Sequence, residues 1–184
     1  MAEVPEDIIR GCRRGNERCQ ERLYHFLAPR MYGLCLQYAE NEDDAKDILQ
    51  EGFIKVFTKI DQYSGKGSMA GWVRRIMINT ALEKYRSQVR HVSFEQGTSA
   101  KEEFFEEDIL DSLSAEEIIK LIQDLSPQYR LIFNLYAIEG YSHKEISEMT
   151  GISEGTSKSN LSRARAILQK KLEEMHSNKL KIKK

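Results

Sequence analysis

The chain has 184 residues, of which 40% are hydrophobic and 31% charged, and this suits one domain or two small ones in a soluble helical protein. The lack of an 18-residue apolar run excludes a transmembrane helix, and the N-terminal residues lack the basic start and apolar core of a signal peptide, so we expect a cytoplasmic protein without membrane insertion. The net charge of −1, taken by itself, argues against a DNA-binding protein.

Charged side chains are distributed unevenly along the chain. Residues 1–90 carry 15 basic and 13 acidic side chains, residues 91–125 carry 2 and 10, and residues 126–184 carry 11 and 6. Two mildly basic blocks therefore flank a strongly acidic connector, and each block can still meet a nucleic acid.

The cysteines and histidines do not suggest a metal site. The three cysteines, Cys12, Cys19 and Cys35, are an odd number without a Cys-x-x-Cys pair, which is typical of reduced structural thiols. A zinc site would need a fourth ligand, and His25 is the only nearby histidine. No metal and no cofactor is expected.

The first block is dense in apolar residues at helical spacing. Leu23, Phe26 and Leu27 begin one helix, and the pattern resumes at Met31. Pro29 lies between these positions and lacks a backbone N–H, so it is expected to kink or interrupt the helix.

Three further segments complete the first block. The polar run at 41–44 is a start signal for a helix that extends to about Ile60. Residues 61–68 contain two glycines and are predicted to form a loop. A further helix is predicted over about 69–90.

Residues 91–113 are acidic and show no sustained apolar period, so they are predicted to form a flexible linker. Apolar spacing returns after Ser114. There are no convincing strands. The predicted fold is all-α, with two small helical domains at residues 1–90 and 114–184 joined by the acidic linker.

The second block carries the start and stop signals of a helix-turn-helix unit. Ser126 before Pro127 predicts a helix start. Ser142 and Glu145 have the spacing of a capping box, and Gly151 suits the left-handed end of a short helix. A short helix, a tight turn and a longer helix are therefore expected in the C-terminal domain.

The helix after this turn, over about 154–172, has two contrasting faces. Its inward side is formed by Ser157, Leu161, Ala164, Leu168 and Leu172. Its opposite side and flank carry Lys158, Ser159, Ser162, Arg163 and Arg165. Small residues let a helix enter the major groove, where Arg163 can bond guanine O6 and N7 while Lys158 and Arg165 hold phosphates. The alternative is a solvated basic helix, which the capping box and the turn disfavour because helix-turn-helix geometry uses them together.

Several strings of residues resemble one protein family. LSPQYRLIF (125–133), GYSHKEIS (140–147) and EGTSKSNLSRAR (154–165) resemble region four of bacterial RNA polymerase sigma factors, in particular the extracytoplasmic function class of the sigma-70 family. DAKDILQEGFIKVF (44–57) and MAGWVRRIMINTA (69–81) resemble region two. The resemblance spans about 20–172, and two motif blocks in the family's order are more specific than one helix-turn-helix.

The resemblance implies a protein that is not an enzyme. It implies that the chain binds core RNA polymerase at the large-subunit clamp helices and flap and directs it to promoters in a stress or cell-envelope response. Region two would then melt the minus-ten element and read it as single-stranded DNA, and region four would read the minus-thirty-five element as duplex. An anti-sigma factor is a further expected partner.

The resemblance assigns the outward side of the 44–60 helix to polymerase binding. This side carries Asp47, Gln50, Glu51 and Ile54. Carboxylates around an exposed isoleucine suit a partner with basic residues around an apolar spot. From the residues alone, a surface helix with one stray apolar side chain is equally open.

The candidate contacts to the minus-ten strand are Tyr63, Lys66, Arg75, Asn79 and Arg86. Arginine, asparagine and aromatic side chains hold unpaired bases by stacking and hydrogen bonding, and the loop at 63–69 can cup a flipped base. Trp72 shares the helix sector of Arg75 and Asn79, but the alternative that it is a core residue stays open.

Two residues depart from the family pattern. Ser157 stands where the family often has an apolar residue, so the recognition helix is expected to pack less tightly. Asn160 stands where the family often has Arg or Gln, which leaves the promoter sequence open.

Two other classes of protein compete with this interpretation. A conventional helix-turn-helix regulator would bind duplex DNA by itself, usually as a dimer on a palindrome. A metal-dependent enzyme would use Asp43, Asp44, Asp47 and Glu51, but no second acidic cluster or histidine at ligand spacing supports it. Transcription with purified core polymerase distinguishes the classes.

Overall fold

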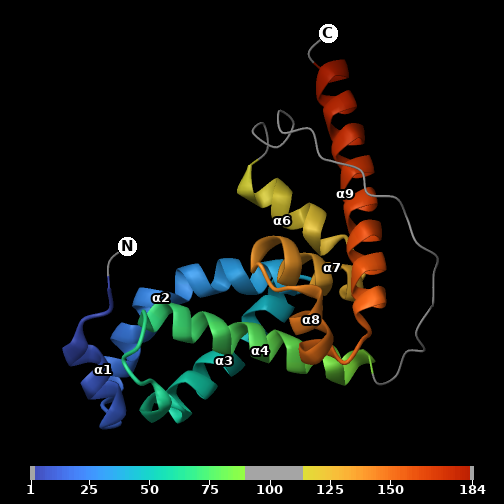
Figure 1. Ribbon diagram of the computed structural model, residues 1–184. Helices are drawn as coiled ribbons and strands as arrows, with labels where there is room; N and C mark the ends of the chain where they lie inside the picture. Colours follow the sequence, from blue (N-terminus) through green and yellow to red (C-terminus); the bar gives the residue numbers. More distant parts are fainter. Residues whose placement is uncertain (1–2, 90–113, 183–184) are drawn as a thin grey trace. The chain divides into compact units, whose positions relative to one another are not determined.

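The computed structural model describes residues 3–89 and 114–182, and it divides the chain into two compact units, Met1–Ser87 and Gln88–Lys184. Every regular element among the described residues is helical, which confirms the all-α fold class (Figure 1). The predicted linker at 91–113 lies outside the described residues.

The N-terminal unit contains the helices α1 (Glu6–Arg13), α2 (Glu17–Tyr38), α3 (Glu42–Thr58), the short 3₁₀ helix η1 (Ile60–Gln62) and α4 (Met69–Val89). The predictions for α3 and α4 are confirmed to within two residues. The helix α1 was not predicted from the sequence. It follows Pro5, and its first turn carries Glu6 and Asp7, two acids that suit a helix N-terminus.

Of the two expected effects of Pro29, a kink or an interruption, the interruption is wrong, because α2 runs through the proline. A proline in a helix removes one backbone hydrogen bond, here the one that the carbonyl of His25 would accept. Pro29 and His25 both lie on the exposed side of α2, where water can donate to that carbonyl instead.

The core of the N-terminal unit is apolar. Leu23 and Met31 of α2, Val56 of α3 and Val73 of α4 have no exposed surface. The ring centroids of Tyr24 and Phe53 lie 4.7 Å apart where α2 packs on α3. This core fixes which faces of α3 and α4 remain at the surface.

The C-terminal unit contains α6 (Ala115–Gln123), α7 (Pro127–Phe133), the π-helical turn η2 (Asn134–Ile138), α8 (His143–Thr150) and α9 (Glu154–Ile182). The predicted capping box of Ser142 and Glu145 forms at the start of α8, and Gly151 ends that helix with a φ of 79°. The helix-turn-helix is therefore present as predicted. Its recognition helix α9 packs on α6 and α7, and the buried cluster between them consists of Leu121, Leu125, Ala164, Leu168 and Leu172.

Two local features of this unit were not expected. Ser126 precedes α7 as predicted, but its side chain makes no capping hydrogen bond. The segment after α7 widens into a π-helical turn, in which the N–H of Glu139 donates to the carbonyl of Asn134, five residues earlier. The turn carries Tyr136 toward the start of α8, where its ring stacks on His143.

Candidate functional site

The outward face of α3 has the composition that the sequence predicts. Asp47, Gln50 and Glu51 are exposed, and Ile54 is 66% exposed among them. The opposite stripe is buried and consists of Ala45, Leu49, Gly52, Phe53, Val56 and Ile60. The face therefore offers one apolar side chain surrounded by acids, an arrangement that fits a basic partner surface.

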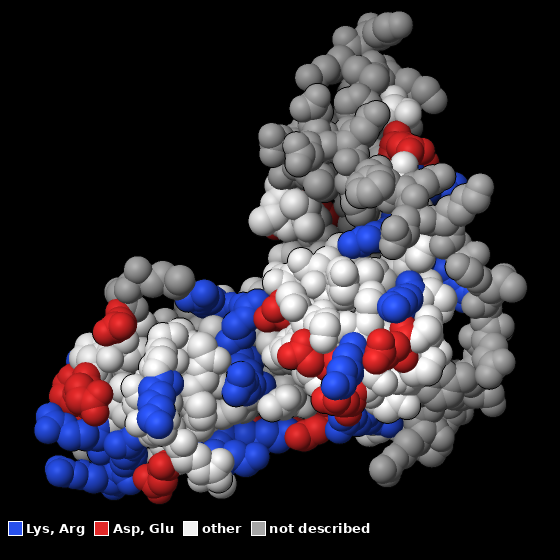
Figure 2. Space-filling view, in the orientation of Figure 1, with Lys and Arg blue, Asp and Glu red and all other residues white. Residues whose placement is uncertain are grey.

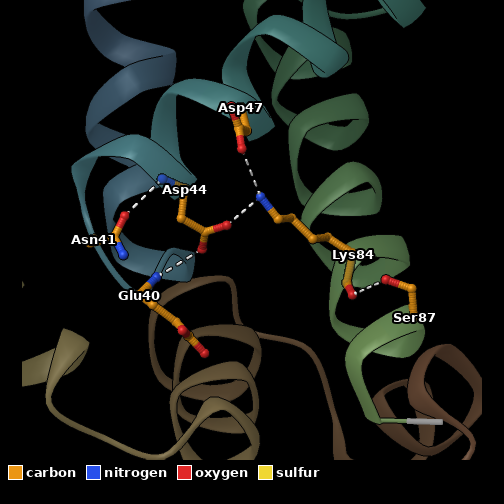
Figure 3. Close-up of polar contacts among 6 residues, drawn as sticks. All are labelled: Glu40, Asn41, Asp44, Asp47, Lys84 and Ser87. Carbon is orange, nitrogen blue, oxygen red and sulfur yellow. Dashed lines mark hydrogen bonds and ion pairs between the residues drawn. The ribbon is translucent and has the colours of Figure 1, made fainter. Parts of the chain in front are cut away.

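Lys84 of α4 joins this face to the neighbouring helix (Figure 3). Its Nζ forms an ion pair with Asp44 and lies 3.5 Å from Oδ2 of Asp47. Asp44 is itself held, because its Oδ2 accepts from the N–H of Glu40 at 2.9 Å and its own N–H donates to Asn41 Oδ1 at 2.9 Å. Burial opposes the charge of Lys84, but the bonds and charges of Asp44 and Asp47 outweigh it and raise the pKa of the lysine.

A second lysine bridges the same two helices. Lys55 Nζ lies 2.7 Å from Glu51 on α3 and 2.7 Å from Glu83 on α4. Burial again opposes the charge, and the two carboxylates outweigh it and raise the pKa of Lys55. Two of the predicted polymerase contacts, Asp47 and Glu51, are thus each paired with a lysine. Neither Lys84 nor Lys55 was predicted from the sequence to take part.

The loop before α4 borders a hollow of about 380 Å³. Gly65 and Gly67 of the loop line it and have φ values of 76° and 83°, which favour glycine. Arg30 from α2 and Arg74 from α4 also line the hollow. These two arginines were not among the predicted DNA contacts, because no local pattern in the sequence places them beside the loop.

Tyr63 supports this loop from within. It is 7% exposed, and its hydroxyl donates to the carbonyl of Gly67 at 2.7 Å. The guanidinium of Arg13 donates to the carbonyl of Tyr63 and so ties α1 to the loop. Tyr63 therefore has little surface left for a DNA base, whereas Lys66 on the same loop is exposed.

The remaining minus-ten candidates lie on the open side of α4. Arg75, Asn79 and Arg86 are exposed, and the last two line a second hollow of about 220 Å³ together with Lys59. Trp72 is half-buried, with its ring 5.6 Å from that of Tyr63. On the face in Figure 2, acidic and basic side chains lie side by side at the α1 end of the N-terminal unit, and basic side chains predominate over the rest of that unit.

The recognition helix α9 presents the predicted faces. The predicted inward residues Ser157, Leu161, Ala164, Leu168 and Leu172 are all buried. Lys158 is exposed, and Ser159, Ser162, Arg163 and Arg165 are half-buried. Arg163 donates to the Tyr129 hydroxyl at 3.4 Å, a long hydrogen bond.

The two departures from the family pattern lie inside the unit. Ser157 is fully buried, and its Oγ lies 2.9 Å from Nδ1 of His143. A hydrogen bond thus stands where looser packing was expected. Asn160 is 5% exposed and its Nδ2 has no hydrogen-bond partner among the described residues, so burial keeps this side chain from a DNA groove.

Metal and membrane sites are not found in the described part of the chain. No group of His, Cys, Asp or Glu side chains within residues 3–89 and 114–182 could hold a metal ion. None of the helices described there is long and apolar enough to cross a membrane. The three cysteines are free, and burial raises the pKa of Cys35 to about 12, so this thiol stays protonated.

Comparisons with known proteins match both units. The family model for sigma-70 region 2 matches residues 23–91, and that for sigma-70 region 4 matches residues 115–168. The RNA polymerase sigma-H factor of Pseudomonas aeruginosa is 26% identical, with 93% of this chain and 95% of the relative covered. The ECF RNA polymerase sigma-E factor of Haemophilus influenzae is 25% identical, with 94% and 98% covered.

A solved structure shares the fold. The sigma factor RpoE, in a complex with the anti-sigma factor NepR from Bartonella quintana, has a TM-score of 0.50 and 23% identity over 83% of this chain and 96% of that one. The two matched regions cover more than half of the present chain, in the order of the family, which is not known for enzymatic activity. The chain therefore belongs to the sigma-70 family of RNA polymerase sigma factors, in its extracytoplasmic function class.

Proposed function

We propose that this chain binds core RNA polymerase and directs it to promoters, with its N-terminal unit at the minus-ten element and its C-terminal unit at the minus-thirty-five element. The observation that carries the proposal is the presence of both family regions in order, each with an exposed face of suitable chemistry. The class of its relatives favours a role in a stress or cell-envelope response, in the cytoplasm.

The α3 face binds the clamp helices of the large polymerase subunit in this proposal. Ile54 enters an apolar spot, and Asp47, Gln50 and Glu51 meet surrounding basic and polar groups. Lys84 and Lys55 restrict the rotamers of two of these acids before binding, which lowers the entropy lost on association. The second polymerase contact, at the flap, belongs to the C-terminal unit.

The minus-ten strand runs along the open side of α4. Arg75, Asn79 and Arg86 hold its bases and phosphates, and Lys66 holds its backbone at the loop. The hollow behind the loop accepts a flipped base, whose unstacking costs a few kcal/mol that the pocket contacts must offset. Tyr63 acts indirectly, by shaping the loop.

The minus-thirty-five duplex receives α9 in its major groove. Ser159, Ser162 and Arg163 face the base edges, and Lys158 and Arg165 hold phosphates. Phosphate contacts of this kind set the register of the helix, and the base contacts select the sequence.

An anti-sigma factor is a further proposed partner. The chain shares its fold with a sigma factor that was solved in complex with an anti-sigma factor. Copurification with the full-length chain is the way to look for such a partner. We expect the anti-sigma factor to cover the α3 face. Core polymerase is proposed to bind the same face, so the two partners would exclude each other.

Run-off transcription tests the proposal. Purified full-length chain is added to core polymerase on a library of bacterial intergenic fragments, and the transcripts are sequenced. We expect initiation at a defined subset of fragments with a shared pair of upstream elements. The alternative, a conventional helix-turn-helix regulator, predicts no such initiation and a sharp footprint on duplex DNA without polymerase.

A further inference from the structure

A polar cluster joins three elements of the C-terminal unit, and the proposed function does not explain it. It consists of Tyr136 on η2, His143 at the start of α8, and Ser157 and Arg165 on α9. The hydroxyl of fully buried Ser157 lies 2.9 Å from Nδ1 of His143. The imidazole stacks on Tyr136 with centroids 4.4 Å apart and planes 20° apart, and the Arg165 guanidinium lies 5.8 Å from the centre of the same ring.

The position of this cluster gives it control over the recognition helix. His143 begins the first helix of the helix-turn-helix, and Ser157 lies one turn into the second, so their bond spans the turn at Gly151. Ser147 closes the same turn, because its hydroxyl donates to the carbonyl of Ile152 at 2.6 Å. A directional bond at a buried position fixes the angle between two helices more narrowly than an apolar contact does.

The charges around His143 connect the cluster to DNA. Burial, Lys158 and Arg165 lower the pKa of His143, and Glu154 opposes them. Tyr136 covers the ring from η2. Lys158 and Arg165 are also two of the proposed phosphate contacts, so a bound duplex would neutralise the two cations that disfavour a charged imidazole.

We propose that His143 is a positioning residue for duplex recognition. It holds α9 at its DNA-reading angle through Ser157, and through Tyr136 it holds Arg165 ready for a phosphate. When the duplex binds, phosphates neutralise Lys158 and Arg165, and His143 takes up a proton from solvent on its free ring nitrogen. The inference rests on the proposed minus-thirty-five role of this unit.

Three variants test the inference in the full-length chain bound to core polymerase. His143→Phe keeps an aromatic ring on Tyr136 but removes the bond, Ser157→Ala removes its other partner, and a double variant removes both. The probe is the duplex that the wild-type holoenzyme selects from a randomised library. We expect each single variant to lower duplex affinity about threefold to tenfold and the double variant to lose less than the product of the two, because no buried hydroxyl is then left unpaired.

The pH profile separates positioning from a merely structural role. Because the bound state holds an extra proton, wild-type affinity should gain at least about twofold relative to His143→Phe as the pH falls from 7.5 to 5.5. A loss of thermal stability alone would leave the two profiles parallel. Parallel profiles, additive single variants, or variants with wild-type affinity would each overturn the inference.

The wild-type control distinguishes this result from a failure of the proposed function. If the wild-type chain gives no promoter-dependent transcripts with core polymerase, the sigma role fails and the variants test nothing more. If the wild-type chain initiates at promoters and the variants match it in affinity and pH profile, only the positioning role of His143 is wrong.

Discussion

The two units of this sigma factor place their polar side chains differently. In the described part of the N-terminal unit, the hydroxyls of the buried residues Thr80 and Tyr63 donate to carbonyls four residues away in the sequence, those of Ile76 and Gly67. Ion pairs of that unit, formed by Lys55 and Lys84 with acids of α3 and α4, lie near the surface. Among its described residues, the C-terminal unit instead buries four polar side chains, Arg130, Asn134, Ser157 and Asn160.

This difference suggests two ways of preparing a surface for a partner. Ion pairs near the surface contribute about 0–1 kcal/mol each, and they can be exchanged for partner contacts without loss of the fold. Buried polar groups cost about 1–3 kcal/mol when they lose a partner, so they fix a geometry that the unit cannot easily leave. The N-terminal unit thus offers an adaptable face to the polymerase, and the C-terminal unit offers a rigid helix to DNA.

The largest expected effect comes from charging the C-terminal interior. Asn160→Asp buries a carboxylate of nearly equal shape, and we expect it to lower the free energy of unfolding by about 3–5 kcal/mol. Asn160→Leu is the matched control and should change it by less than about 1 kcal/mol, since the amide Nδ2 has no partner among the described residues.

Urea unfolding measures this effect in each unit separately. The single tryptophan, Trp72, lies in the N-terminal unit, so its fluorescence follows that unit alone while circular dichroism follows both. We expect the tryptophan transition of Asn160→Asp to match the wild type. A shift of the tryptophan transition by the same amount would contradict the division into two independently unfolding units.

A charge reversal on the α3 face should have the next largest effect. Asp47→Arg places a cation where the polymerase is expected to carry basic residues, and we expect core binding to weaken by about 2–3 kcal/mol, or roughly 30- to 150-fold. Glu21→Arg reverses an exposed acid on α2 and serves as the control. Binding is measured by fluorescence anisotropy of labelled chain, and equal losses for both variants would show only a general charge effect.

A smaller effect is expected at the lysine that joins α3 to α4. Lys84→Met leaves Asp44 and Asp47 without their cation, and we expect the N-terminal unit to lose about 1 kcal/mol of stability. Because salt screens the partly exposed pair in the wild type, the difference should shrink in concentrated salt. Tryptophan-detected urea unfolding at two salt concentrations measures it, and a difference that does not change with salt would argue for lost packing instead.

The smallest effect is a pH dependence of the C-terminal unit. The pKa of His143 is lower in the folded chain than its ordinary value of about 6.5, so the unfolded chain binds a proton first as the pH falls. Stability is therefore fully present above about pH 6.5 and declines as the pH falls below it. Circular dichroism melts should show a weaker decline for His143→Phe, and an identical decline would assign the titration to other groups.

The local signals of the sequence predicted much of the fold. The inward stripes of α3 and α9 follow from helical periodicity, and the capping box at Ser142 and the left-handed Gly151 follow from residue type and spacing. These features depend on residues within a few positions of one another. Helical periodicity over neighbouring positions also identified the exposed side of α3, which carries Asp47 and Ile54.

The missed features depend on contacts across the chain. Lys84 lies 37 residues from Asp47, and His143 lies 14 residues from Ser157, so neither contact leaves a periodic pattern. Proline is disfavoured inside helices because it leaves a carbonyl without its hydrogen bond. At Pro29 that carbonyl lies on the exposed side of α2, so the helix continues through the proline. Tyr63 was predicted as a DNA contact from its residue type, and its burial became visible only in three dimensions.

A combined footprint on one promoter tests the central claim, that one unit opens the minus-ten strand and the other reads upstream duplex. Hydroxyl radicals report duplex protection, and permanganate reports unpaired thymines, both on the wild-type holoenzyme and on its Asn79→Ala and Arg163→Ala variants. We predict that Asn79→Ala loses strand opening but keeps upstream protection, and that Arg163→Ala weakens upstream protection first. Equal loss of both signals in both variants, or full upstream protection by the free chain without polymerase, would contradict the account.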